Sequence, residues 1–266
     1  MNQALPFSGK TAWVTGADSA VAMAVAKELY RRGASLLLSG VESPPEGLSS
    51  GGGQTVACYP RNPTDEERAD RALGLVARLD LMVAGTRSPE RSSIASGSAA
   101  IFDRVIEENL TAAFVALRAA ARKMGRSRSG PLLVLSSIHG DKPTAGAPVF
   151  GIANGGLAML VREAAQDLGR FGFRVNLLRY GPLEGDEAIF RSERSGIYWD
   201  MENRIPRGRP AAPEEIARAV LFLCGEDASF VNGAVLTADG GFLGHYVAGD
   251  SARRWDIGFG GGGACE

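Results

Sequence analysis

The stretch that decides the fold runs from Leu133 to Gly169 and reads LVLSSIHGDKPTAGAPVFGIANGGLAMLVREAAQDLG. It begins as a buried strand that ends in two serines and continues through a polar loop. A long apolar helix follows, which carries Phe150 and Asn154 one turn apart on one face. Open α/β sheets place their ligand sites at the carboxyl ends of their strands, where such loops begin. We therefore expect the functional site to lie in this stretch.

The alternation of strand and helix continues on both sides of this stretch. Further strands are expected at 10–16, 35–39, 54–59, 81–84, 174–178 and 234–238. Further helices are expected at 23–32, 64–79, 99–125 and 213–223. Strands that alternate with helices along a chain form a parallel sheet with helices on both faces. The predicted fold class is an α/β doubly wound parallel sheet of about seven strands, in one domain.

Composition places the chain among ordinary globular proteins. Its 266 residues are 45% hydrophobic and 22% charged, with a net charge of -1, which favours a small-molecule substrate over nucleic acid or a membrane surface. The three cysteines, Cys58, Cys224 and Cys265, are too widely spaced for a metal cluster, and their odd number argues against a disulfide framework. The N-terminus lacks the features of a signal peptide, and no apolar run suits a membrane span. We expect a cytoplasmic protein without a metal site.

Short motifs along the chain follow the order and spacing of one family. They are TG at 15–16, NPTD at 62–65, Asn109 within a long helix, LSS at 135–137, RVN at 174–176, and IPRGRPAAPEEIARAVLFL at 205–223 leading to ADGG at 238–241. Over residues 9–243 the chain thus resembles the short-chain dehydrogenase/reductase superfamily. The resemblance implies a seven-stranded Rossmann-type domain that forms homodimers or homotetramers through its two long central helices. It also implies hydride transfer between a nicotinamide cofactor and a carbonyl or alcohol.

This resemblance divides the chain into three parts. Residues 1–8 form an N-terminal arm, residues 9–241 form the Rossmann-type domain, and residues 242–266 form a tail that ends in the Gly-rich GFGGGGACE. Within the domain, residues 184–205 are charged and aromatic without clear periodicity. Such a segment beside a site is typical of a lid.

The phosphate loop keeps only part of the family's glycine pattern. The TGxxxGxG motif appears as TGADSAVA at 15–22, in which Gly16 remains and alanines replace the other two glycines. Those glycines permit a tight turn and let the backbone approach the pyrophosphate. Ala20 adds a methyl group there, although alanine also simply strengthens a helix. Asp18 adds a negative charge near the expected phosphates, which is unfavourable.

The end of the second strand offers no residue that chooses between NAD and NADP. An acidic side chain there would bind the ribose 2′-hydroxyl and a basic one the 2′-phosphate, but Ser39 and Gly40 occupy the position. The expected cofactor is therefore NAD(P) bound weakly, or none. The residues expected to contact it are Gly16, Asp18, Ala20, Asn62 and Asn154.

The family's four catalytic positions are only half preserved. Asn, Ser, Tyr and Lys correspond here to Asn109, Ser137, Phe150 and Asn154. Phe150 has no titratable proton, and Asn154 carries no charge to lower the pKa of a neighbour. Loss of a positioned acid or base typically slows a reaction by about 100- to 10,000-fold. The family's usual proton transfer is therefore unavailable at these two positions.

Two other side chains are candidates for acid/base work. His139 follows Ser137 by two residues, in the loop that lines the family's substrate pocket, and histidine titrates near neutral pH. Tyr180 occupies the first position of the family's PG pair, beside the nicotinamide site. We place Phe150 and Glu184 in the substrate pocket.

Three functions fit these observations. We favour a divergent enzyme that acts on a small oxygen-bearing metabolite by non-redox chemistry, namely dehydration, isomerisation or cyclisation. In it, Ser137 would hold an oxygen and His139 or Tyr180 would act as acid/base. Asn109 and Asn154 would be polar positioning groups. The second function is an NAD(P)-dependent carbonyl/alcohol oxidoreductase with a non-standard proton donor. The third is a non-catalytic subunit.

Overall fold

The fold is a single seven-stranded parallel sheet, as predicted. The computed structural model describes residues 5–85, 92–126, 129–143, 146–185 and 205–244. The strands are β1 (Thr11–Thr15), β2 (Ser35–Ser39), β3 (Val56–Tyr59), β4 (Leu81–Ala84), β5 (Pro131–Ser137), β6 (Arg174–Tyr180) and β7 (Val235–Ala238). Their order is β3-β2-β1-β4-β5-β6-β7, and every neighbouring pair is parallel. The predicted Rossmann-type α/β fold is confirmed.

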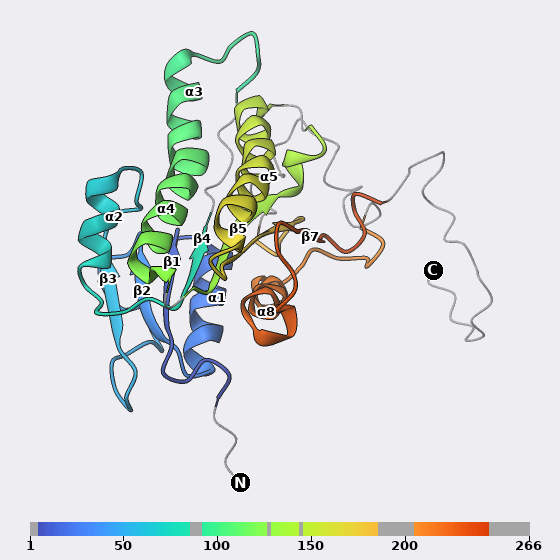
Figure 1. Cartoon of the computed structure of the whole chain (residues 1–266). Helices are drawn as coiled ribbons and strands as arrows, with labels where there is room; N and C mark the ends of the chain where they lie inside the picture. Colours follow the sequence, from blue (N-terminus) through green and yellow to red (C-terminus); the bar gives the residue numbers. More distant parts are fainter. Residues whose placement is uncertain (1–4, 86–91, 127–128, 144–145, 186–204, 245–266) are drawn as a thin grey trace, which may run out of the picture.

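Helices cover both faces of the sheet (Figure 1). They are α1 (Ala20–Arg31), α2 (Glu66–Leu73), α3 (Ala99–Ile106), α4 (Ala112–Met124), α5 (Pro148–Gly169) and α8 (Pro213–Cys224). Helices α1 and α8 pack on one face, and α2, α4 and α5 pack on the other. Because both faces are covered, the strands are apolar on both sides and read as continuous hydrophobic runs.

Strand β5 shows how the sheet sorts its side chains. Leu133 and Leu135 lie in the hydrophobic cluster beside α1 and α8, whereas Leu132 and Val134 lie in the cluster beneath α4 and α5. Successive side chains of a strand alternate between faces. The two serines that end the strand therefore face opposite sides of the sheet.

The long helix expected at 99–125 is interrupted in its middle. Helix α3 passes into a π-helical turn, η1 (Glu107–Thr111), before α4 begins. Asn109 lies in this turn and is 1% exposed. Such turns occur often at functional sites, and apolar periodicity alone does not reveal them.

Two other elements differ in length from the sequence prediction. The helix expected at 64–79 ends at Leu73, followed by Gly74, whose weak helix propensity favours termination. The strand expected at 174–178 continues to Tyr180, because β6 pairs with β5 as far as Ser137. Tyr180 is thus a strand residue and not a loop residue.

The lid and tail predictions fall largely outside the described residues. Only Glu184, Gly185 and Ile205 of the predicted lid, and residues 242–244 of the predicted tail, are described. Among the described helices, none is both long and apolar enough to cross a membrane.

Candidate active site

Ser136 and Ser137, at the carboxyl end of β5, have different surroundings. The Ser136 side chain is fully buried, and its hydroxyl donates to Asn154 Oδ1 at 2.9 Å. Ser137 is half-buried, and its hydroxyl accepts from the backbone N–H of His139 at 3.3 Å. Ser136 therefore belongs to the scaffold, whereas Ser137 retains hydrogen-bonding capacity for a ligand.

Asn154 has become part of the scaffold. Its Oδ1 accepts from Ser136 and from the backbone N–H of Ser137 at 2.7 Å, and its Nδ2 donates to the Phe150 carbonyl at 2.8 Å. The side chain has no exposed surface. Its amide joins α5 to the end of β5, and the cofactor contact predicted for Asn154 stays a prediction.

His139 lies against both Ser137 and Phe150. Its Nδ1 is 3.2 Å from the Ser137 hydroxyl oxygen, and its ring meets the Phe150 ring edge-on with 5.8 Å between centroids. Burial lowers the pKa of His139 below its usual value. The imidazole is therefore neutral at pH 7, and Nδ1 can accept the Ser137 proton.

The loop that carries His139 is held on two sides. On one side, Gly140 packs so closely on α5 that a Cβ there would lie 2.9 Å from the Asn154 carbonyl. On the other side, Asp141 forms an ion pair with Arg179, whose side chain is 5% exposed and lies in β6 opposite Ser136. These contacts fix His139 beside Ser137. Sequence analysis missed Arg179, although an arginine within the apolar run RVNLLRY at 174–180 is an available signal.

Three other predicted site residues lie around this centre. Tyr180 is the register partner of Ser137 in β6 and packs against the α1/α8 cluster. Asn109 donates to the Val105 carbonyl at 3.0 Å within its own helix. Glu184 is exposed, and its carboxylate lies 4.0 Å from Arg209, on the side of β6 away from β5. Tyr180 is thus beside Ser137, whereas Glu184 contacts Arg209.

The phosphate loop keeps the backbone geometry that a dinucleotide needs. Gly16 adopts φ +66°, and a Cβ there would lie 3.1 Å from Gly85. Its N–H donates to Asn62 Oδ1 at 2.7 Å, so Asn62 holds the turn from a distant loop. Ser19 caps the following helix α1 through the Ala22 N–H. The remaining first-turn N–H groups of a helix have no intrahelical partner and suit an anion.

The alanines that replace two glycines do not close this loop. Ala22 is fully buried, and its methyl group packs on Gly85, which has no side chain to obstruct it. Ala20 is exposed at the start of α1. The residues of the phosphate loop therefore fit a bound diphosphate. The one additional methyl group on the exposed surface is that of Ala20.

Asp18 lies toward the end of β2. A Cβ on Gly40 would stand 2.9 Å from Asp18 Oδ1, and the amide of Asn62 lies 3.4 Å from the same oxygen. The carboxylate therefore occupies the space that a side chain at position 40 would enter. That position is the one at which dinucleotide sites recognise the ribose.

Comparison with known families supports the assignment that this geometry suggests. The family model described as Enoyl-(Acyl carrier protein) reductase matches residues 16–243. The chain belongs to the short-chain dehydrogenase/reductase superfamily. The seven-stranded parallel sheet and the placement of Ser137 at the carboxyl end of β5 follow the expectation from the sequence motifs.

Curated and structural relatives in this superfamily match nearly the whole chain. A cis-4-hydroxycyclohexanecarboxylate dehydrogenase of Sinomonas cyclohexanicum is 32% identical, over 89% of this chain and 97% of its own. A 3-oxoacyl-(acyl-carrier-protein) reductase FabG of Rickettsia bellii is 28% identical, over 90% of this chain and 99% of its own. A short-chain type dehydrogenase/reductase from Mycobacterium ulcerans has a TM-score of 0.81 at 28% identity, covering 90% of this chain and 91% of its own.

These relatives correct the predicted chemistry. The preferred hypothesis of non-redox dehydration, isomerisation or cyclisation is wrong, because the relatives are named as dehydrogenases and reductases. The physical error lay in treating the changes at positions 150 and 154 as evidence of a new reaction. Asn154 instead has a structural role, because its buried amide holds the end of β5.

Proposed function

We propose that this protein is a nicotinamide-dependent oxidoreductase that interconverts a small alcohol and its carbonyl compound. The observation that carries the proposal is the contact between the Ser137 hydroxyl and His139 Nδ1 at the carboxyl end of β5. Family membership and the names of the relatives support the redox class. One of those names also supports a secondary alcohol on a ring as the substrate class.

Ser137 and His139 form a short proton path. The substrate hydroxyl donates to Ser137 Oγ, whose own proton passes to His139 Nδ1 as the alcohol is oxidised. In the reverse direction, the imidazolium returns that proton through Ser137 to the carbonyl oxygen. The nicotinamide cofactor supplies or accepts the hydride. Because burial lowers the pKa of His139, the neutral imidazole prevails at pH 7 and favours alcohol oxidation there.

Asp18 gives the cofactor site a preference for NAD over NADP. Its carboxylate occupies the space in front of Gly40, where a ribose hydroxyl could donate to it. A 2′-phosphate at the same place would bring two negative charges together, which is unfavourable. Gly16 and the first turn of α1 hold the diphosphate, while Asn62 fixes the turn.

The two central helices provide a surface for a homo-oligomer. Four large hydrophobic side chains on α3, α4 and α5 are about half exposed: Phe102, Phe114, Ile152 and Met159. Burial of such side chains against a second copy is favourable by roughly 25 cal/mol per Å² of apolar surface. A dimer or tetramer through these helices is therefore part of the proposal, and light scattering after size-exclusion chromatography tests it.

The proposed activity is tested by cofactor binding and turnover together. NADH and NADPH are titrated into the purified protein while tryptophan fluorescence is followed. NAD⁺ and NADP⁺ are then incubated with a panel of cyclic and linear secondary alcohols while nicotinamide reduction is followed. We expect saturable binding and turnover of a ring alcohol. The absence of binding for both cofactors at millimolar concentration would overturn the proposal.

A further inference from the structure

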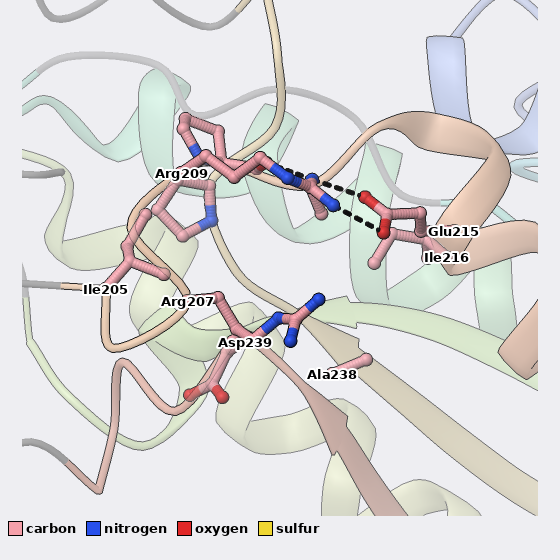
Figure 2. A pocket seen from close by; sticks show the side chains of 11 residues that line it. Ile205, Arg207, Arg209, Glu215, Ile216, Ala238 and Asp239 are labelled. Atoms are coloured by element: carbon pink, nitrogen blue, oxygen red, sulfur yellow. Dashed lines mark hydrogen bonds and ion pairs between the residues drawn. The ribbon is translucent and has the colours of Figure 1, made fainter. Parts of the chain in front are cut away.

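A pocket lies beside the proposed active site, with β6 between the strand that carries Ser137 and the strand that borders the pocket. It has a volume of about 280 Å³ and is bounded by segment 205–211, the first turn of α8 and the ends of β6 and β7 (Figure 2). Strands in a sheet are spaced by about 4.8 Å, so the end of β7 lies roughly 10 Å from Ser137 in β5. The pocket therefore lies at the same edge of the sheet as Ser137, two strands away from it.

Part of the pocket surface is apolar and suits a ring or a short chain. Pro182, Ile205, Ile216 and Ala238 contribute this part. Ile205 and Ile216 are at most 3% exposed, so they form a fixed surface. A cavity of about 150 Å³ can hold benzene. The larger volume here has room for a ring that carries one polar substituent.

The acidic side chains around the pocket are already engaged. Glu215 accepts two hydrogen bonds from Arg209, at 2.7 and 2.9 Å, and one from the Ala212 N–H. These bonds lower the pKa of Glu215 to about 2, Arg209 having the largest effect. Asp239 accepts from the backbone N–H groups of Gly241 and Leu243 at 2.8 and 2.7 Å. Both carboxylates therefore already have hydrogen-bond donors.

Arg207 is different, because its guanidinium has no hydrogen-bond or ion-pair partner among the described residues. Figure 2 shows this group on the pocket side of its segment, between Asp239 and Ala238. The backbone that carries it is held in place, since its N–H donates to the Gly240 carbonyl at 3.2 Å. Gly240 packs so tightly that a Cβ there would lie 2.8 Å from Ile205. The pocket thus presents a guanidinium that is unpaired within the described part of the chain, on a held backbone and beside an apolar surface.

We propose that this pocket binds a small carboxylic acid, with the carboxylate on Arg207 and its apolar part against Ile205 and Ile216. A guanidinium offers two parallel N–H donors that match the two oxygens of a carboxylate. The apolar surface selects acids with a ring or chain over small inorganic anions. The site does not depend on the proposed function, because binding requires neither cofactor nor turnover.

The experiment titrates benzoate into the cofactor-free full chain by calorimetry, with benzamide as the uncharged probe of the same shape. We expect saturable benzoate binding and at least tenfold weaker benzamide binding. Arg207→Gln should weaken benzoate binding at least tenfold, and Arg207→Lys should restore part of the affinity. Arg218→Gln removes an exposed arginine of α8 that does not line the pocket, and should leave benzoate binding unchanged.

Two results would overturn the proposal. One is the absence of saturable binding for both benzoate and hexanoate at millimolar concentration. The other is benzoate binding that Arg207→Gln leaves unchanged while circular dichroism shows the variant to be folded. Loss of cofactor binding, in contrast, would refute the proposed function without affecting this site.

Discussion

The loops that follow β1 and β5 leave the same edge of the sheet but are held differently. The β1 loop is held by Asn62, which donates to Asp18 and accepts from Gly16, and its charged group remains at the surface. The β5 loop is held from beneath by the fully buried Asn154. The first loop thus keeps a charged side chain at the surface, whereas the second is held by a buried amide.

This difference concerns what holds each loop in place. Around β5 the amide of Asn154 and the Arg179–Asp141 ion pair fix the backbone, so Ser137 and His139 keep their relative position. Under the proposed function, backbone groups around β1 bind the cofactor, so side-chain changes there should alter selectivity more than shape. Variants of the two loops should therefore fail in different ways.

The largest effect is expected from Ser137→Ala. If Ser137 holds the reacting oxygen, its loss should lower kcat/KM for the alcohol by about 100- to 1,000-fold while the fold is retained. Steady-state kinetics and circular dichroism measure the two quantities. Ser136→Ala is the matched control, because its hydroxyl contacts Asn154 and its loss should cost about 1 kcal/mol of stability. Full turnover by Ser137→Ala would rule out the proposed proton path.

Asn154→Ala should act on stability. The change leaves the Ser136 hydroxyl and the Ser137 N–H buried without their partner, which should reduce the free energy of unfolding by about 3 kcal/mol. Urea denaturation followed by circular dichroism measures the change. Arg162→Ala, at an exposed position of the same helix, should change the stability by less than about 0.5 kcal/mol. Equal stability of the two variants would contradict the scaffold role of Asn154.

Asp18→Ser tests the β1 loop. Removal of the carboxylate should shift the ratio of NADPH to NADH affinity toward NADPH by about tenfold, equivalent to 1.4 kcal/mol. Fluorescence titration with each cofactor gives the ratio. Glu42→Gln removes an exposed acid two residues beyond Gly40 and should leave the ratio unchanged within about twofold, because solvent screens exposed charges. An unchanged ratio in Asp18→Ser would show that the carboxylate does not select the cofactor.

Much of the fold could be predicted from the sequence, because apolar runs such as Leu133 to Leu135 reflect burial on both faces of the sheet. The position of Ser137 at the end of β5 followed from the same pattern. The sequence could not reveal that Asn154 is directed inward or that Asp18 lies in front of Gly40, because both depend on tertiary contacts between distant segments. The π-helical turn at Asn109 has no periodic signature either.

The smallest effect concerns His139 and the pH dependence of stability. Burial lowers the pKa of His139 in the folded state, so the unfolded chain binds the proton more readily. The free energy of unfolding should therefore fall as the pH drops below the ordinary histidine pKa of about 6.5. His139→Gln should remove this part of the pH dependence, on the order of 1 kcal/mol or less. Urea denaturation from neutral to mildly acidic pH measures it. A steeper loss of stability at low pH in His139→Gln than in the native protein would contradict this expectation. It would mean that protonation of His139 stabilises the fold. The ring would then have an acidic partner and would not be the neutral acceptor of the Ser137 proton.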